Sequence, residues 1–291
     1  MISHTSQSRF FNYFSKLLVI VLLIGMVESC MKMRTSTKKT KEFFNSNATA
    51  YQDRTFEFDG HQIHYIQTGN PEKPTLFFVH GSPGSWDAYK RYLSDSLLLK
   101  KYRLIAIDRP GFGYSDFREA QNLETQSEWI TKLIQSIANK KPIALIGHSM
   151  GGPVITKLAV DNPSLYAHLV ILAGAIDPKA ETPEKWRPII KAFPLRYLIP
   201  GALRPSNDEL WWLKKDLVKM QPELSKITSN IIVIHGTKDP LVPFSNVAFI
   251  QKEFTHASLI TVIPIENANH FIPWEHYDTI RGALLNLKME E

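Results

Sequence analysis

The sequence predicts an α/β domain with a mostly parallel, doubly wound sheet, and two observations lead to this fold class. Short apolar runs, rich in β-branched and aliphatic residues, recur along the chain from about residue 75. Runs that are apolar on both faces suit strands buried inside a parallel sheet. Helical patterns lie between several of them, and such alternation is typical of a doubly wound sheet.

The predicted elements begin with an N-terminal hairpin. Thr55–Phe58 and Gln62–Ile66 alternate in polarity around the turn Asp59-Gly60. The buried strands that follow are Thr75–Val79, Arg103–Ile107, Pro142–Ile146, His168–Leu172, Ile231–Ile234 and Leu259–Ile265. The helical patterns are Glu128–Asn139, Gly151–Val160, Asn246–Glu253 and Ile280–Leu287.

A long insertion interrupts this alternation before the strand at 231–234. About 55 residues without clear strands contain seven prolines and three of the six tryptophans. A plain loop of that length is uncommon inside a compact domain. We therefore expect a small helical cap over the sheet at about residues 177–229.

The positive charge is confined to the N-terminal segment. The chain has 34 basic and 28 acidic residues, of which residues 1–41 hold seven and one. The remaining 250 residues carry 27 of each sign and are neutral. This distribution argues against a nucleic-acid partner and is typical of a targeting or membrane-surface segment.

The segment also carries an apolar run, Leu17–Val27, preceded by Arg9 and Lys16. It is short for a spanning helix, which needs roughly 20 apolar residues, but suits the core of a signal peptide. The following Val27–Cys30 resembles a bacterial lipoprotein signal, in which the cysteine is acylated, although Glu28 departs from the usual small or apolar residue. The alternative is a non-lipidated signal peptide or an uncleaved anchor.

These features predict three regions. Residues 1–29 form a signal peptide of the lipoprotein type, residues 30–53 a basic polar linker, and residues 54–291 the α/β domain. The protein is expected to be exported and anchored to a membrane on the periplasmic or outer side of a bacterial cell envelope. Because Cys30 is the single cysteine, no disulfide can form within the chain.

The candidate nucleophile is Ser149, in Gly147-His148-Ser149-Met150-Gly151. This Gly-x-Ser-x-Gly segment follows a predicted buried strand and opens a helical pattern. A serine on such a sharp turn needs small residues two positions away on either side, because larger side chains would meet neighbouring backbone. The context, more than the motif alone, points to a nucleophilic serine.

The serine hydroxyl needs a base, and the base needs an acid that orients it. His270 follows the last predicted strand, in the loop Asn267–Pro273, and is the candidate base. Asp239 follows the strand 231–234 in a turn with Gly236 and Pro240 and is the candidate acid. Asp177, after the preceding strand, remains the alternative acid.

An oxyanion formed during acyl transfer needs two backbone N–H donors. Met150, directly after the nucleophile, is expected to supply one. The other is expected from Ser82, in the loop His80–Gly84 that follows the strand 75–79. His80 is expected to shape this loop and His148 to pack beside the nucleophile.

Five motifs together resemble the capped group of the α/β-hydrolase superfamily. They are His80–Gly84, Asp108–Ser115, Gly147–Gly152, Gly236–Asp239 and Asn267–His270, each at the end of a predicted strand. The resemblance covers about residues 55–288. It implies the catalytic triad Ser149, Asp239 and His270, in agreement with the assignment from chemistry.

The expected activity is esterase-like cleavage of a carboxylic ester (EC 3.1.1) through an acyl-enzyme, with no cofactor and no metal. A serine nucleophile argues against the epoxide hydrolases and haloalkane dehalogenases of this group, which use an aspartate. The alternatives are an aminopeptidase, a C–C bond hydrolase, a perhydrolase or a non-catalytic binding protein. The substrate is expected to be a small molecule with an apolar acyl group, bound by cap residues that include Trp186, Phe193, Trp211 and Trp212.

Overall fold

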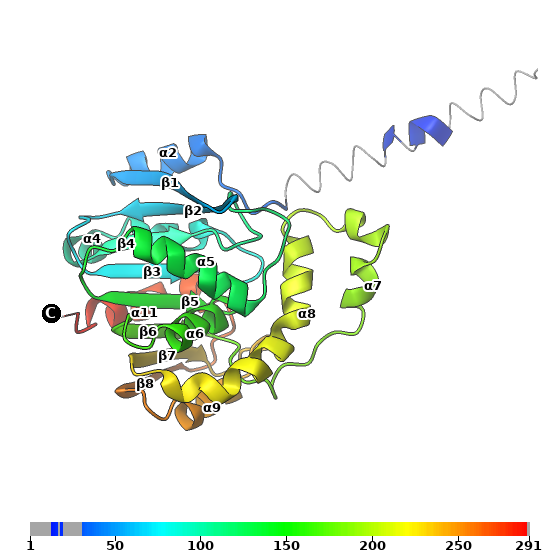
Figure 1. The fold of residues 1–291 in the computed structure, drawn as a ribbon. Coiled ribbons are helices and arrows are strands. Elements are labelled where there is room, and N and C mark those ends of the chain that lie inside the picture. Colours follow the sequence, from blue (N-terminus) through cyan, green and yellow to red (C-terminus); the bar gives the residue numbers. More distant parts are fainter. Residues whose placement is uncertain (1–12, 17, 20–30, 290–291) are drawn as a thin grey trace, which may run out of the picture.

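The chain folds around an eight-stranded sheet that is parallel except at its N-terminal edge (Figure 1). The computed structural model describes residues 13–16, 18–19 and 31–289. The strand order is β1-β2-β4-β3-β5-β6-β7-β8, with β1–β2 and β2–β4 antiparallel and the other pairs parallel. The strands are β1 (Tyr51–Phe58), β2 (His61–Thr68), β3 (Thr75–Val79), β4 (Arg103–Ile107), β5 (Ile143–His148), β6 (His168–Leu172), β7 (Asn230–Gly236) and β8 (Leu259–Ile265).

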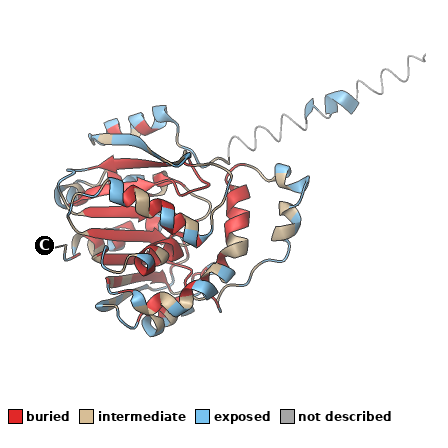
Figure 2. Ribbon diagram, viewed as in Figure 1, coloured by how far each residue is buried: buried red, intermediate tan, exposed pale blue. Residues whose placement is uncertain are grey.

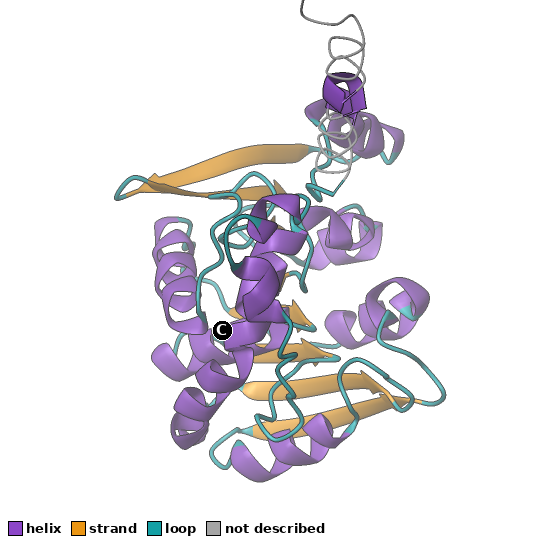
Figure 3. Ribbon diagram, turned by 90° about the vertical axis from the view of Figure 1, so that its right-hand side faces the viewer, coloured by secondary structure: helices purple, strands orange, loops and turns teal. Residues whose placement is uncertain are grey.

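Helices cover both faces of the sheet, as Figure 3 shows. One face packs against α5 (Leu123–Ser136), α6 (Gly151–Asp161) and α9 (Ser245–Glu253). The other packs against η1 (Trp86–Tyr89), α3 (Lys90–Leu93), α4 (Ser96–Lys101), α10 (Ile272–Glu275) and α11 (Tyr277–Leu285). The predicted α/β class with a doubly wound sheet is confirmed.

The apolar runs form the central strands because successive side chains point to opposite faces of a sheet. In β3, Phe77 and Val79 belong to one core cluster, whereas Leu76 and Phe78 belong to the other. A strand buried on both faces is therefore apolar at nearly every position, as in β3, where only Thr75 is polar.

The expected cap is present between β6 and β7. It consists of α7 (Arg187–Lys191), η2 (Leu195–Leu198), α8 (Leu203–Met220) and η3 (Gln221–Lys226). Figure 2 shows that the first half of α8 is buried, whereas α7 and η2 are half-buried or exposed. Helix α8 thus lies between the sheet and the outer part of the cap.

The segment 30–53, expected to be a linker, contains a packed helix, α2 (Thr37–Ser46). Phe44 is fully buried, and its ring stacks 6.0 Å from that of Trp86. Only Thr40 and Phe44 of this helix are buried. The prediction of a linker was therefore wrong for this helix. Its polar composition hid two buried positions, Thr40 and Phe44, which are enough to pack the helix against the domain.

The predicted signal peptide and lipidation site fall in residues 1–30. Cys30 and most of residues 1–29 lie outside the described residues, so the signal peptide and the lipidation stay predictions. Within the described residues, no helix is both long enough and apolar enough to span a bilayer.

Candidate active site

Ser149 lies in a sharp turn between β5 and α6. Its φ is +53°, a left-handed value that is uncommon for residues other than glycine and indicates local strain. The turn is held by the amide of Ser149, which donates to the carbonyl of Leu172 (3.0 Å), and by that of Gly152, which donates to the carbonyl of Ser149 (2.9 Å). Any side chain at Gly151 would overlap the Val79 carbonyl, so the close packing requires glycine.

His270 and Asp239 meet at the same edge of the sheet, after β8 and β7. The Nδ1 of His270 lies 2.7 Å from Oδ2 of Asp239, and both residues are buried. The Oδ1 of Asp239 accepts hydrogen bonds from the amides of Leu241 (2.9 Å) and Val242 (2.8 Å). Burial alone would raise the pKa of the Asp239 carboxyl, but these hydrogen bonds lower it below its ordinary value. The carboxylate is therefore charged at neutral pH and can orient the imidazole.

Asp177, the alternative acid, is engaged elsewhere. Its Oδ1 accepts from the amide of Lys179 (2.8 Å), and its own amide donates to Asn246 (2.8 Å). It makes no hydrogen bond to His270. The geometry thus favours Asp239 as the partner of the candidate base.

His148 connects the loop of His270 to the serine turn. Its Nε2 donates to the carbonyl of His270 (3.0 Å), and the two rings are 4.8 Å apart. Burial and the nearby His270 lower the pKa of His148 to about 3, so it is neutral. Within the described residues the hydroxyl of Ser149 makes no hydrogen bond; catalytic contacts of this kind often shorten only when substrate is bound.

The two expected oxyanion donors lie at the ends of β3 and β5. Neither the Ser82 nor the Met150 amide donates a hydrogen bond to any acceptor in the described part of the chain. Met150 is buried and Ser82 is half-buried, and two amides without a protein acceptor beside the serine turn suit a site that binds a developing oxyanion. The Oγ of Ser82 donates to Oγ of Ser206 on α8 (2.8 Å), which connects this loop to the cap.

The loop that carries Ser82 is held by a residue to which the sequence analysis gave no role, Arg109. Its Nε donates to the His80 carbonyl and its Nη2 to the Gly81 carbonyl, both at 2.9 Å. The same guanidinium pairs with both carboxylate oxygens of Glu209 on α8, at 2.7 and 2.8 Å. Gln126 accepts its last N–H (2.9 Å), so all five donors are used.

His80 has the loop-shaping contacts expected of it. Its Nδ1 donates to the carbonyl of Gly81 (2.7 Å), and its Nε2 accepts from the amide of Arg109 (3.0 Å). Complete burial and the nearby guanidinium hold the pKa of the imidazole well below its usual value. His80 is therefore neutral, with its proton on Nδ1.

The aromatic residues expected to line an acyl pocket divide into two groups. Trp211 and Trp212 on α8 are half-buried, and the Nζ of Lys191 lies 4.6 Å from the centre of the Trp212 ring. Trp186 and Phe193 are 47% and 83% exposed. Phe193 in particular is too exposed to line an enclosed pocket, because it lies on the outer surface of the cap.

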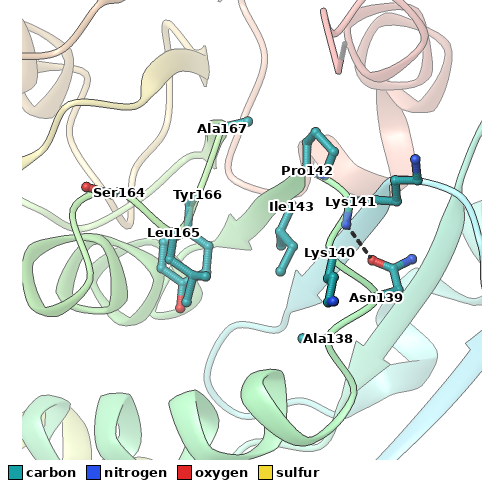
Figure 4. Close-up of a pocket in the computed structure, with 10 residues that line it drawn as sticks. All are labelled: Ala138, Asn139, Lys140, Lys141, Pro142, Ile143, Ser164, Leu165, Tyr166 and Ala167. Carbon is teal, nitrogen blue, oxygen red and sulfur yellow. Dashed lines mark hydrogen bonds between the residues drawn. The ribbon is translucent and has the colours of Figure 1, made fainter. Parts of the chain in front are cut away.

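A surface hollow of about 710 Å³ lies at the opposite edge of the sheet (Figure 4). Its lining includes Asn139, Pro142 and Ala167, which precede β5 and β6. Ser149 follows β5, so this hollow is separated from the site by the length of the strands. Within the described residues, no group of three or more His, Cys, Asp or Glu side chains could hold a metal ion.

Comparisons with known proteins agree with the fold. A family model described as the alpha/beta hydrolase fold matches residues 74–199. An uncharacterized hydrolase, YugF, of Bacillus subtilis is 32% identical over 42% of this chain and 44% of its own length. Epoxide hydrolase 1 of Caenorhabditis elegans is 27% identical over 55% of this chain and 39% of its own. The chain thus spans less than half the length of these two curated relatives.

A solved structure of a bacterial membrane phospholipase A has a TM-score of 0.61 and 19% identity, over 96% of this chain and 100% of that one. At this identity the likeness is one of fold. Together with the strand order, the turn at Ser149 and the family model, it shows that the chain has the α/β-hydrolase fold.

Proposed function

We propose that the protein is a serine hydrolase that cleaves carboxylic esters through an acyl-enzyme. The observation that carries the proposal is the 2.7 Å hydrogen bond between His270 and Asp239, at the strand edge where the strained turn holds Ser149. This arrangement supplies a nucleophile, a base and an acid in the chain order typical of the superfamily.

The mechanism follows from these positions. The Nε2 of His270 takes the proton of the Ser149 hydroxyl as its oxygen attacks the ester carbonyl, while Asp239 stabilises the imidazolium. The amides of Ser82 and Met150 bind the oxyanion, a contribution of about 10²–10³ in rate for each donor. The imidazolium then protonates the leaving alcohol. Water, activated by His270, finally cleaves the acyl-enzyme.

Amide cleavage is the second candidate. A fungal relative named proline iminopeptidase PfmaB, from Pestalotiopsis fici, is 23% identical over 77% of this chain and 95% of its own length. The same triad supports either bond, so the leaving group and the cap decide between them. Epoxide hydrolysis is less favoured despite the names of several relatives, because Ser149 stands where that group uses an aspartate.

A fluorophosphonate probe tests the nucleophile directly. We expect the full chain to be labelled, Ser149→Ala to be unlabelled, and Ser258→Ala to be labelled like the wild type. Ser258 is an exposed serine just before β8, at the far end of the strands, which makes it a matched control. An unlabelled wild type would favour a non-catalytic binding protein.

Turnover of matched substrates identifies the bond. Aryl esters of increasing chain length, aminoacyl anilides and a β-diketone should be compared with the same enzyme preparation. We expect the esters to react fastest and longer apolar acyl groups to be preferred. Equal rates for acetyl and octanoyl esters would remove the predicted acyl preference, and faster anilide cleavage would favour the aminopeptidase.

We also propose that the chain is exported and acylated on Cys30. Its support is the sequence alone: a basic start, an apolar run of signal-peptide length and a cysteine directly after it. Intact mass of the mature protein from a bacterial host is the test. We expect cleavage before Cys30 and added acyl mass, both lost in Cys30→Ser.

A further inference from the structure

The outer part of the cap, residues 186–198, exposes a cluster of large apolar side chains that we call the cap tip. It comprises α7, η2 and the turn between them. Its six exposed apolar and aromatic residues are Trp186, Ile189, Phe193, Leu195, Tyr197 and Leu198. Helices α7 and η2 contact each other, and the rings of Phe193 and Tyr197 meet edge to face at 6.1 Å.

Elsewhere in the described chain, the pair Phe271 and Trp274 next to His270 (rings 6.2 Å apart) and residues of the N-terminal segment are also exposed, and the other large apolar side chains are more scattered. Leu97, Val218, Leu241 and Leu259, for example, lie on four separate segments. Single exposed apolar residues are normal on a soluble protein, whereas a contiguous group marks a contact surface. The cap tip is therefore expected to be covered by a binding partner or a membrane.

The charge of this segment indicates what the occupant is. Residues 185–200 contain four basic residues and no acidic one. The guanidinium of Arg187 lies 4.7 Å from the ring centre of Trp186, and that of Arg196 lies 6.0 Å from that of Tyr197. Arg187 also pairs with Glu184, and Lys191 lies 3.5 Å from Asp208. Aromatic and aliphatic side chains rimmed by basic ones are the composition of membrane-interface segments.

The path of the N-terminal segment supplies an independent argument. The carbonyl of Met31 accepts a hydrogen bond from the amide of Ala202 (2.8 Å), just after the cap tip. The apolar run Leu17–Val27 ends four residues before Met31. Four residues span at most ~14 Å, so a bilayer that holds this run or an acylated Cys30 lies close to the cap tip.

We propose that the cap tip docks on a bilayer that contains anionic lipids, with its apolar side chains at the boundary between headgroups and acyl chains. Segments of this kind insert by about 5–10 Å. Arg187 and Lys191 are paired with Glu184 and Asp208, so the attraction to the negative headgroups comes mainly from Lys185 and Arg196. The N-terminal segment keeps the chain at the membrane, and the cap tip sets how the body is oriented on it.

Docking would also bring the candidate active site toward the lipid. Asn207 on α8 donates to the carbonyl of Arg187 on α7 (3.2 Å), and the neighbouring Ser206 contacts Ser82 of the oxyanion loop. The cap tip and the Ser82 loop are thus joined through one turn of α8. Under the proposed function, on which this step rests, the substrate class is a membrane-embedded ester.

A fluorescent label at one position tests the docking without using activity. In full-length chain carrying Cys30→Ser, Ile189→Cys and Leu259→Cys are each labelled with an environment-sensitive fluorophore. The two residues are matched in exposure, at 63% and 60%, but Leu259 begins β8 at the opposite end of the strands. With vesicles of phosphatidylcholine and phosphatidylglycerol we expect a blue shift at position 189 and none at 259.

Three results would overturn the proposal. In the first, both labels stay in water while the protein sediments with the vesicles. In the second, the label at 189 is already shifted before vesicles are added and light scattering gives a dimer, so that a second copy covers the cap tip. In the third, the shift is as large with phosphatidylcholine alone, which would remove the role of anionic lipid.

A kinetic comparison then separates docking from catalysis. The double variant Ile189→Glu and Leu198→Glu exposes charge where apolar burial is expected. We expect its rate on an ester embedded in anionic vesicles to fall at least ~10-fold, since each buried side chain contributes more than a factor of ten. Its rate on a soluble aryl ester should not change. An equal loss on both substrates would contradict the docking role, whereas no wild-type turnover of either ester would contradict only the proposed function.

Discussion

Replacing Glu209 by glutamine perturbs the contact that ties the cap to the oxyanion loop. Arg109 and Glu209 are fully buried and form a bidentate ion pair, and the same guanidinium holds the carbonyls of His80 and Gly81. Glutamine keeps the size and shape of the side chain but removes its charge. Glu209→Gln therefore leaves a charged guanidinium buried without a counter-ion.

The magnitude follows from the burial. Removing one partner of a buried ion pair typically costs about 3–5 kcal/mol, because the other charge stays in a medium that solvates it poorly. The total stability of a domain is about 5–15 kcal/mol. We expect Glu209→Gln to lower the free energy of unfolding by about 3–5 kcal/mol. The loop at Ser82 should also be held less firmly, with slower fluorophosphonate labelling of Ser149.

The assay is urea unfolding followed by tryptophan fluorescence, with Glu124→Gln as the control. Glu124 pairs with Lys219 on the surface, where both side chains are mostly exposed. Exposed pairs contribute little to stability, so the control should stay within the scatter of repeat measurements. A loss below about 1 kcal/mol in Glu209→Gln, with an unchanged urea dependence, would refute the reasoning.

Three further predictions concern single positions. Asp239→Asn should fold normally but lower turnover by up to about 10⁴, since its amide no longer favours the productive imidazole tautomer; an activity near that of the wild type would exclude it as the acid. Gly151→Ala should lower the melting temperature, because its Cβ overlaps the Val79 carbonyl, whereas Gly282→Ala in α11 has open space and should be neutral or stabilising. His148 has a pKa of about 3 in the fold against about 6.5 when unfolded, so it stays neutral while the unfolded chain takes up a proton. Stability should therefore be lost as pH falls below 6.5, by up to about 1.4 kcal/mol per pH unit from this group, and His148→Gln should show a shallower slope in unfolding measured against pH.

The strands, the candidate nucleophile and the candidate base could be predicted from local sequence patterns. The boundaries of β3, β4, β6 and β8 agree with the apolar runs. β3, β4 and β6 are buried on both faces, as predicted, whereas the prediction that β8 is buried was wrong, because β8 is an edge strand whose residues are half-buried or exposed. Residues directly after parallel strands gather at one edge of the sheet. Strand ends and chain order were therefore enough to propose Ser149 and His270 together.

Contacts between distant parts of the chain could not be predicted from local sequence patterns. Arg109 and Glu209 are 100 positions apart, and their pairing depends on how α8 crosses the sheet. The choice between Asp239 and Asp177 depends in the same way on the path of two loops. No periodicity in the sequence carries information about such pairings.

Hydrophobicity predicted burial least well where the sequence is polar or has no regular pattern. The segment Arg204–Glu209 is polar yet buried on all sides, between the sheet and the outer cap, whereas Phe193 is apolar and exposed. Composition describes what each side chain prefers, but burial depends on what packs against it. Hydrophobicity therefore located the sheet, whereas the packing of the cap on the body determined which of its residues face the active site and which face outward.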